Sequence, residues 1–368
     1  MPDKKEAKEA LDTLIKKSRV HLYKPIQIAE ILYRHRVYNN INLLSKEDYR
    51  IKSRAWRDDI SIDLLGRKCT STIKFQDNLF EDNAIPPAIL DVLGKENVKT
   101  KGAVEAYIYK KFSAKHDQLS IALNKCLTAT KEDFKVKEFI DSFWNEPGLK
   151  RSLDKVYEII VYALFSTIVE ALELQVEISV NETSLPILKE FEDFSKKIMC
   201  LDFSKPSHIE SAKVYRVGVT NAADRGLDMY SNWGPAIQIK HLSLDIELAQ
   251  DIVNSVSSEK IVIVCKDAEK DVILSLLTQI GWKSRIQSIV TENDLINWYE
   301  KALRGKYKDT LAEKLLERLA VEIAEEFPSV DTTPEGAQKG KRGQTANETV
   351  LILLQNQGFC IYKNIPCV

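Results

Sequence analysis

The sequence predicts an α/β protein in which a mixed β-sheet is flanked by helices and preceded by a mainly helical N-terminal region. Three observations predict this. The spacing of apolar residues is mostly helical over residues 1–148. From residue 149 onward, helical and alternating segments follow as helix, several strands, helix, strand, helix and strand. The length of 368 residues also accommodates two domains.

The N-terminal region is expected to consist of short helices with one strand-like stretch. Apolar spacing predicts helices over residues 26–33, after the two prolines within 83–94, and over 102–112. Residues 61–75 contain strand-like pieces around Gly66. The turn-forming run Asn145-Glu146-Pro147-Gly148 breaks the pattern, so we place a boundary at residue 148.

The second half is expected to be the α/β layer, over residues 149–327. A nearly all-apolar helix is predicted over 153–172, where burial on every side is indicated. Strands are predicted over residues 175–180, 213–220, 236–242, 260–265 and 286–290. Helices are predicted over residues 187–198, 245–256, 268–279, 294–303 and 310–326. Residues 328–368 are expected to be a linker, rich in Pro, Gly, Thr and charge, followed by a C-terminal docking segment.

Charge is unevenly distributed along a chain whose net charge is only −1. Residues 16–74 contain 14 Lys and Arg against 6 Asp and Glu, a local charge of +8, which leaves −9 for the rest. A basic stretch in an acidic chain suggests a surface that faces a polyanion, although a run of charge alone is more often a solvated helical face. Within it, Arg50, Lys52, Arg54 and Arg57 flank Trp56 and are candidates for phosphate contact, with core packing expected for Trp56.

Several classes of protein are excluded by missing motifs. The six cysteines form no CxxC pair and have no His at zinc-ligand spacing, and Cys265 is expected to be a reduced core residue. No phosphate-binding P-loop, GxSxG elbow, HExxH motif or glycine-rich turn for a nucleotide cofactor is present. No secretory signal or membrane-spanning run is found either, so we expect a cytoplasmic protein without membrane contact.

The segment with the clearest chemistry covers residues 214–242. Residues two apart on a strand face the same side, so Gln238 and Lys240 are expected to point together. A hairpin through Trp233-Gly234-Pro235 would bring the carboxylate of Asp228 next to Gln238. A carboxylate, an amide oxygen, the carbonyl of Ile239 and an ammonium would then surround one point.

That set of groups suits phosphodiester hydrolysis. The oxygen atoms of Asp228, Gln238 and Ile239 can hold Mg²⁺, which prefers oxygen ligands and keeps several waters. A bound magnesium ion polarises the phosphate and lowers the pKa of a bound water. Lys240 can orient that water and stabilise charge in the transition state.

The arrangement resembles the PD-(D/E)XK nuclease superfamily, with Asp228, nine residues, and then Gln238-Ile239-Lys240. Beyond this motif, the amino-acid sequence resembles the HaeII-type family of type II restriction endonucleases. The residues that show this resemblance are 225–229, 234–242, 261–270 and 298–306. The resemblance implies a restriction-endonuclease-like core over 149–327 and a DNA-recognition clamp over 1–148. It also implies Mg²⁺-dependent cleavage of double-stranded DNA by a homodimer, at a short GC-rich palindrome.

Gln238 departs from the motif, because an acid is usual at this position. A neutral ligand weakens a cation site, so a further acid is expected, and Glu158 in the apolar helix is the candidate. The superfamily often places a glutamate on that helix, although a solvent-facing acid explains Glu158 equally well. Two rival functions remain: a structure-specific or repair nuclease with the same core, and a non-catalytic DNA-binding module.

Three further polar residues near the site are open to two interpretations each. Asp224 could assist Asp228, but a turn-forming role is favoured. His241 is expected to point away from Lys240 and to be packed or hydrogen-bonded. Glu177 could face the site or water.

Overall fold

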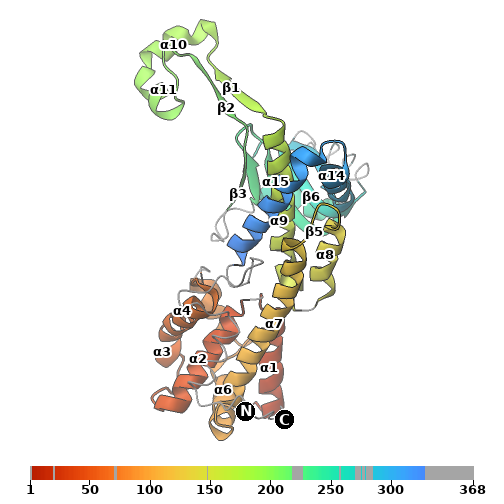
Figure 1. Ribbon diagram of the computed structural model, residues 1–368. Helices are drawn as coiled ribbons and strands as arrows, with labels where there is room; N and C mark the ends of the chain where they lie inside the picture. Colours follow the sequence, from red (N-terminus) through yellow and green to blue (C-terminus); the bar gives the residue numbers. More distant parts are fainter. Residues whose placement is uncertain are drawn as a thin grey trace. The chain divides into compact units, whose positions relative to one another are not determined.

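The predicted α/β class is confirmed in a computed structural model of the chain (Figure 1). The structure describes residues 2–19, 21–69, 73–146, 148–217, 227–256, 258–269, 275, 278 and 285–327. The chain divides into two compact units. Met1–Ile159 and the described residues after 318 form the first unit, and the second contains Ile160–Val217 and Asp224–Arg318. The linker and docking segment expected over 328–368, and most of the helix expected over 268–279, lie outside the described residues.

The first unit is helical in its described residues. Its helices are α1 (Lys4–Lys17), α2 (Tyr23–Tyr38), α3 (Lys46–Tyr49), α4 (Lys52–Leu65), α5 (Ile73–Asp77), α6 (Pro87–Lys99), α7 (Ala103–Leu127) and α8 (Val136–Asn145). Buried aliphatic and aromatic side chains of α1, α2, α4, α6 and α7 form one core. The helices predicted over 26–33, within 83–94 and over 102–112 are confirmed as parts of α2, α6 and α7.

The strand-like prediction for residues 61–75 is wrong. Residues 61–65 are the last turn of α4, and Gly66 ends that helix with a left-handed φ of 68°. Glycine is favoured there because it adopts positive φ without a steric penalty from Cβ. The local pattern was ambiguous because the buried residues Ser61, Leu64 and Leu65 form a helical face that is short and partly polar.

The second unit contains a mixed sheet with the described strand order β3-β4-β5-β6-β7. Its strands are β3 (Val214–Arg216), β4 (Met229–Ser231), β5 (Ala236–Leu244), β6 (Ile261–Ala268) and β7 (Ile286–Thr291). Pairing is antiparallel from β3 to β5 and parallel from β5 to β7. The strands predicted over 236–242, 260–265 and 286–290 are therefore confirmed, and Cys265 is buried in β6 as a free thiol.

Helices cover both faces of this sheet. Helix α12 (Ile246–Ser255) connects β5 to β6 and packs its apolar side on the two strands and on β7. The other face carries α9 (Leu153–Ala171) and α14 (Glu292–Arg304), which are joined where the Tyr299 hydroxyl donates to the carbonyl of Ile160. The last described helix is α15 (Lys308–Glu326). All four helices fall where the sequence predicted them.

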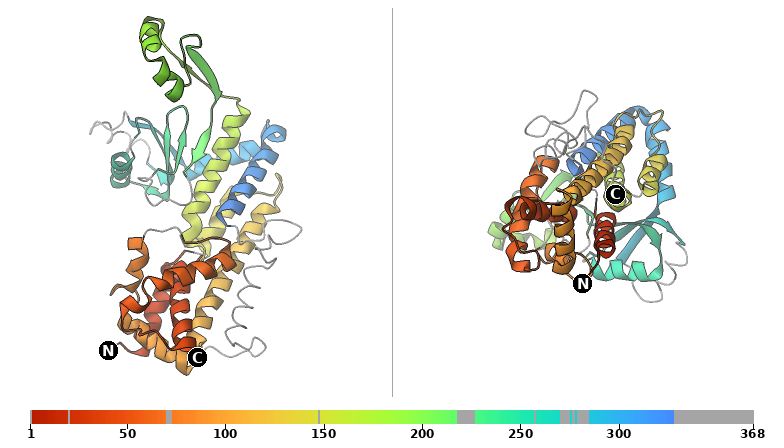
Figure 2. Two further views of the ribbon diagram at one scale, coloured as in Figure 1. Left: turned by 90° about the vertical axis from the view of Figure 1, so that its left-hand side faces the viewer. Right: turned by 90° about the horizontal axis from the view of Figure 1, so that it is seen from below.

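A separate arm leaves the second unit between α9 and β3. It is a two-stranded antiparallel ribbon of β1 (Gln175–Ser179) and β2 (Ser207–Ser211), with α10 (Leu185–Glu190) and α11 (Glu192–Ile198) at its end. The arm stands away from the five-stranded sheet in both side views (Figures 1 and 2). The strand predicted over 175–180 is confirmed, but it belongs to this arm, and the single helix expected over 187–198 is broken at Phe191.

Candidate active site

The predicted hairpin between Asp228 and Gln238 is formed by β4, the turn at residues 232–235 and β5. Gly234 adopts a φ of 121° in the turn, and the Ser231 hydroxyl donates to the Pro235 carbonyl. The described β4–β5 pairing runs from Tyr230–Ala236 to Met229–Ile237. Asp228 is therefore the residue at which the β4 ladder ends, opposite Gln238.

The side chain of Asp228 continues the ladder where the backbone pairing stops. Its Oδ2 accepts the backbone N–H of Ile239 at 2.7 Å and the side-chain Nε2 of Gln238 at 2.5 Å. The backbone carbonyl of Asp228 accepts the N–H of Val217. The N–H and C=O of one strand residue point to the same side, so the Ile239 carbonyl also faces the edge where Asp228 lies. The Asp228 carboxylate, the Gln238 amide and the Ile239 backbone therefore meet at one strand edge, where the amide nitrogen of Gln238 faces Asp228.

Gln238 and Lys240 line a cavity of about 410 Å³ between β5 and α12. Gln238 is only 2% exposed, and its Oε1 is buried without a hydrogen-bond partner. The Lys240 side chain is half-buried and forms no ion pair with a described carboxylate. A buried carbonyl oxygen without a donor is costly, so this atom marks the place where a cation or a donating ligand would be stabilised.

Three polar residues of α12, Asp251, Asn254 and Ser255, line the same cavity, and the sequence did not single them out. Asp251 and Asn254 are exposed at its rim, beside the buried Ile252. The parallel crossover from β5 through α12 to β6 brings this helix back over the face that carries Gln238 and Lys240. The sequence contains little signal for them, because Asp251 and Asn254 lie on the exposed side of the amphipathic helix that directly follows the motif strand.

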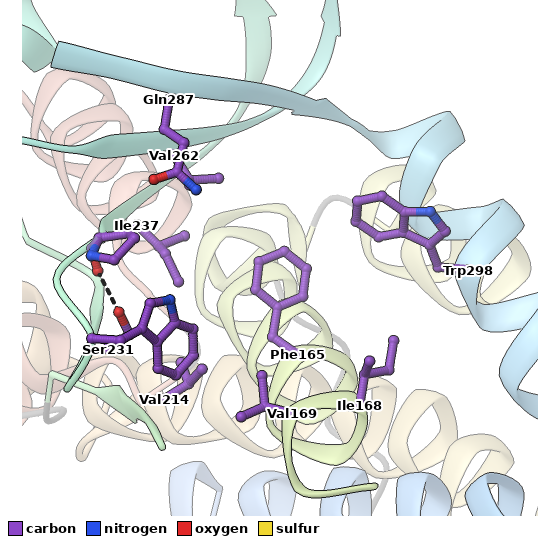
Figure 3. Close-up of a pocket in the computed structure, with 11 residues that line it drawn as sticks. Phe165, Ile168, Val169, Val214, Ser231, Ile237, Val262, Gln287 and Trp298 are labelled. Atoms are coloured by element: carbon purple, nitrogen blue, oxygen red, sulfur yellow. Dashed lines mark hydrogen bonds between the residues drawn. The ribbon is translucent and has the colours of Figure 1, made fainter. Parts of the chain in front are cut away.

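The opposite face of the sheet has a second cavity of about 400 Å³, with a different chemical character (Figure 3). Phe165 and Trp298 approach it from α9 and α14, and Ile237 and Val262 approach from the sheet. Its lining contains no titratable side chain. The described lining of this cavity offers no carboxylate, imidazole or ammonium group, so we place the candidate site on the α12 face.

Glu158 is buried in α9, with 6% of its surface exposed. Its carboxylate forms an ion pair with Lys155, one turn earlier in the same helix, with Nζ–Oε2 and Nζ–Oε1 distances of 2.6 and 2.9 Å. The residue belongs to the first unit, whereas Asp228, Gln238 and Lys240 belong to the second. Burial of the acid is explained by its lysine partner.

The remaining polar residues near the motif are placed as follows. His241 is buried on the side of β5 opposite Lys240, and its Nε2 is 3.0 Å from Glu292 Oε2, which confirms a hydrogen-bonded histidine. Glu177 lies on β1 and is exposed to water. Asp224 lies outside the described residues.

The four basic candidates of the first unit fall into two groups. Lys52 is exposed, and Arg50 and Arg54 are half-buried, at the start of α4. Arg57 is 1% exposed, and its guanidinium donates to Gln27, Gln76 and Asp58. These internal hydrogen bonds account for the burial of the Arg57 guanidinium without any contact to a DNA phosphate. Trp56 packs against the core as expected, with the Arg34 guanidinium 4.5 Å from its ring centroid.

The described residues contain no cluster of three or more His, Cys, Asp and Glu side chains able to hold a metal ion. A cation at the candidate site would therefore depend on amide and backbone oxygens in addition to Asp228. Among the described helices, none is both long and apolar enough to cross a membrane.

Comparison with known proteins shows the family of the chain. The family model described as HaeII restriction endonuclease matches residues 7–338. The type II restriction enzyme HaeII of Haemophilus aegyptius is 59% identical over 331 residues, covering 90% of this chain and 94% of that enzyme. The type II restriction enzyme NgoBI of Neisseria gonorrhoeae is 57% identical over 334 residues, with the same coverage. No solved structure matches the chain. The chain belongs to the HaeII restriction endonuclease family.

Proposed function

We propose that this restriction endonuclease hydrolyses phosphodiester bonds of double-stranded DNA at a short, GC-rich palindrome, with Mg²⁺ as its cofactor. The observation that locates the proposed active site is the cluster of polar groups at the end of the β4 ladder. Asp228, Gln238 and the Ile239 backbone share one strand edge, and Lys240 lines the same cavity as Gln238.

The residues at this edge fit a magnesium ion. Mg²⁺ prefers oxygen ligands, and the edge offers the Asp228 carboxylate, the Ile239 carbonyl and the Gln238 amide oxygen. The buried Gln238 Oε1 has no hydrogen-bond donor, which is the arrangement expected for an atom that serves as a ligand. When bound, the metal would act as a Lewis acid on the scissile phosphate.

Lys240 has a separate role in this proposal. Its ammonium would donate hydrogen bonds to the attacking water and to a non-bridging phosphate oxygen. Such donors stabilise charge that develops during phosphoryl transfer, most strongly in a site partly shielded from water. The half-buried position of Lys240 beside the buried Gln238 agrees with that requirement.

We infer that a further acid compensates for the neutral Gln238, and Glu158, the acid expected from the sequence, is one candidate. Its carboxylate is paired with Lys155, so this role would require that ion pair to open. Asp251 is a second candidate for this role, because it lines the cavity of Gln238 and Lys240. The Mg²⁺ concentration for half-maximal cleavage distinguishes them. If Glu158 is the compensating acid, this concentration should rise at least tenfold in Glu158→Gln and stay unchanged in Asp251→Asn. If Asp251 is the compensating acid, the opposite result is expected.

DNA is held in this proposal by the basic start of α4. Arg50, Lys52 and Arg54 would contact phosphates, which position a protein on the duplex without reading its sequence. Arg57, the fourth basic residue, supports this helix from inside through Gln27 and Gln76. Two copies of the chain would cut the two strands, because a palindromic site matches a twofold dimer.

The function is tested by incubating the purified protein with plasmid and phage DNA, in Mg²⁺ or in EDTA. Discrete bands that require Mg²⁺ are expected, and sequencing of their ends identifies the site. Lys240→Ala should abolish cleavage while preserving the melting temperature. Lys308→Ala, which changes an exposed lysine of α15, is the matched control. A smear of fragments would contradict site specificity, and full activity of Lys240→Ala would contradict the assigned role of that residue.

A further inference from the structure

The end of the arm carries an unusual amount of exposed apolar surface. We call residues 185–203 the tip. Its large apolar side chains are mostly in solvent, at 42–68% exposure: Ile187, Phe191, Phe194, Ile198, Met199 and Phe203. Leu188 and Leu201 are the buried apolar residues of the tip. At roughly 150–250 Å² for each whole side chain, the six leave about 600 Å² of apolar surface in water. That is the upper end of the largest patch on a monomer, about 300–600 Å².

The spacing of these residues shows that they are organised and not scattered. Phe194 and Ile198 are four residues apart on α11, so they lie on one face of that helix. Phe191 lies directly before α11, at the break between the two helices. Each helix is short, and the ribbon that supports the tip has two strands. A two-stranded ribbon is at best marginally stable alone, so packing against another surface would stabilise the arm.

Charge distinguishes a protein partner from DNA. The arm, Gln175–Ser211, contains seven Asp and Glu against four Lys, a net charge of −3. Affinity for DNA depends on basic side chains that neutralise phosphates. An acidic arm with an aromatic and aliphatic tip therefore favours a protein surface that is itself apolar.

We propose that this partner is the tip of a second copy of the chain, so that the arms form the dimer contact. Two tips placed face to face would bury at most about 1,200 Å² of apolar surface, which reaches the lower limit for a specific interface, about 1,200–2,000 Å² in total. A twofold axis places the same patch on both sides, and that arrangement needs no second complementary surface on the molecule. This proposal rests on the homodimer in the proposed function and identifies its surface.

Sedimentation equilibrium of the full chain, without DNA or Mg²⁺, tests the proposal. The wild-type protein should sediment at twice the 42.0 kDa of one chain. The double variant Phe194→Asp/Ile198→Asp should associate at least a hundredfold more weakly, because each symmetric interface then contains four buried carboxylates. Ile121→Asp is the matched control, since Ile121 is an exposed apolar residue of α7 with 61% exposure. Far-UV circular dichroism verifies that each variant is folded.

Two results would overturn the proposal. A wild-type protein that is monomeric at micromolar concentration excludes a stable tip-to-tip dimer. A dimer that is weakened equally by the tip variant and by Ile121→Asp places the interface elsewhere. Neither result depends on cleavage, so a monomeric protein that cuts DNA at one site would overturn the dimer surface and leave the nuclease assignment intact.

Discussion

Replacing Gln238 by Glu restores the acid that is usual in the motif, and the structure predicts that the fold then depends on Mg²⁺. Gln238 Nε2 donates to Asp228 Oδ2 at 2.5 Å. A glutamate in the same position would place two carboxylate oxygens at that separation, in a location where Gln238 is 2% exposed. Without a cation between them, the two acids repel each other, and the hydrogen bond is lost.

The size of the effect follows from these contacts. A hydrogen bond to a charged group contributes about 1.5–3 kcal/mol. Two unit charges about 4 Å apart repel by about 4 kcal/mol at an effective dielectric constant of about 20. Sharing of one proton by the pair relieves part of the repulsion. We therefore expect Gln238→Glu to lower the free energy of unfolding by about 3 kcal/mol in EDTA, or about 6–12 °C in melting temperature.

Thermal melts at pH 8, followed by circular dichroism in EDTA and in Mg²⁺, measure this coupling. Mg²⁺ should restore most of the lost stability, so its stabilising effect should be larger for Gln238→Glu than for the wild type. Gln287→Glu is the matched control, because it makes the same exchange at an exposed position of β7. An unchanged melting temperature in EDTA, or equal effects of Mg²⁺ on the variant and the wild type, would refute the reasoning.

Three further predictions concern the first unit. Arg57→Ala should lower the free energy of unfolding by about 3 kcal/mol, because it breaks a buried charged network. Arg54→Ala should leave urea unfolding unchanged but reduce by about one the slope of log K for DNA against log salt concentration; equal instability of both variants would contradict this division. Burial lowers the pKa of His116 to about 3, so the folded protein leaves this imidazole neutral while the unfolded chain binds a proton below pH 6.5. Stability should therefore fall as pH falls, by about 2 kcal/mol between pH 7 and pH 5. His116→Leu should remove that loss from unfolding curves at the two pH values, and an identical loss in the variant would assign the acid sensitivity to other groups.

The sequence predicts the elements of the second unit well because each has a strong local signal. The strand at 236–242 alternates in polarity after a Trp-Gly-Pro turn, and the helix at 153–172 is apolar on nearly all sides. The arm could not be predicted in the same way. Its ribbon pairs residues about 30 positions apart, and the five residues of β2 include His208 and Glu210 with no apolar alternation. Pairing over such a distance is decided by the whole fold.

The candidate site was predictable in its strand residues and less so in its helical ones. The hairpin and the two-residue period fix Asp228, Gln238 and Lys240, whereas the position of Asp251 depends on how α12 packs on the sheet. Arg57 shows a signal that could have been used. It shares a helical face with Ser53 and Ser61, all three buried, whereas a phosphate contact requires an exposed face.

The position of the Asp228 carboxylate at the end of the β4 ladder affects which inactive variant should be used to crystallise a complex with uncut DNA. Because Asp228 Oδ2 accepts the Ile239 N–H, truncating this residue to alanine would remove a group that joins two strands, together with a proposed metal ligand. The alanine variant would therefore change the structure of the strand edge at the proposed active site. Lys240 makes no such link among the described residues, so its substitution is the better choice for crystallising uncut substrate.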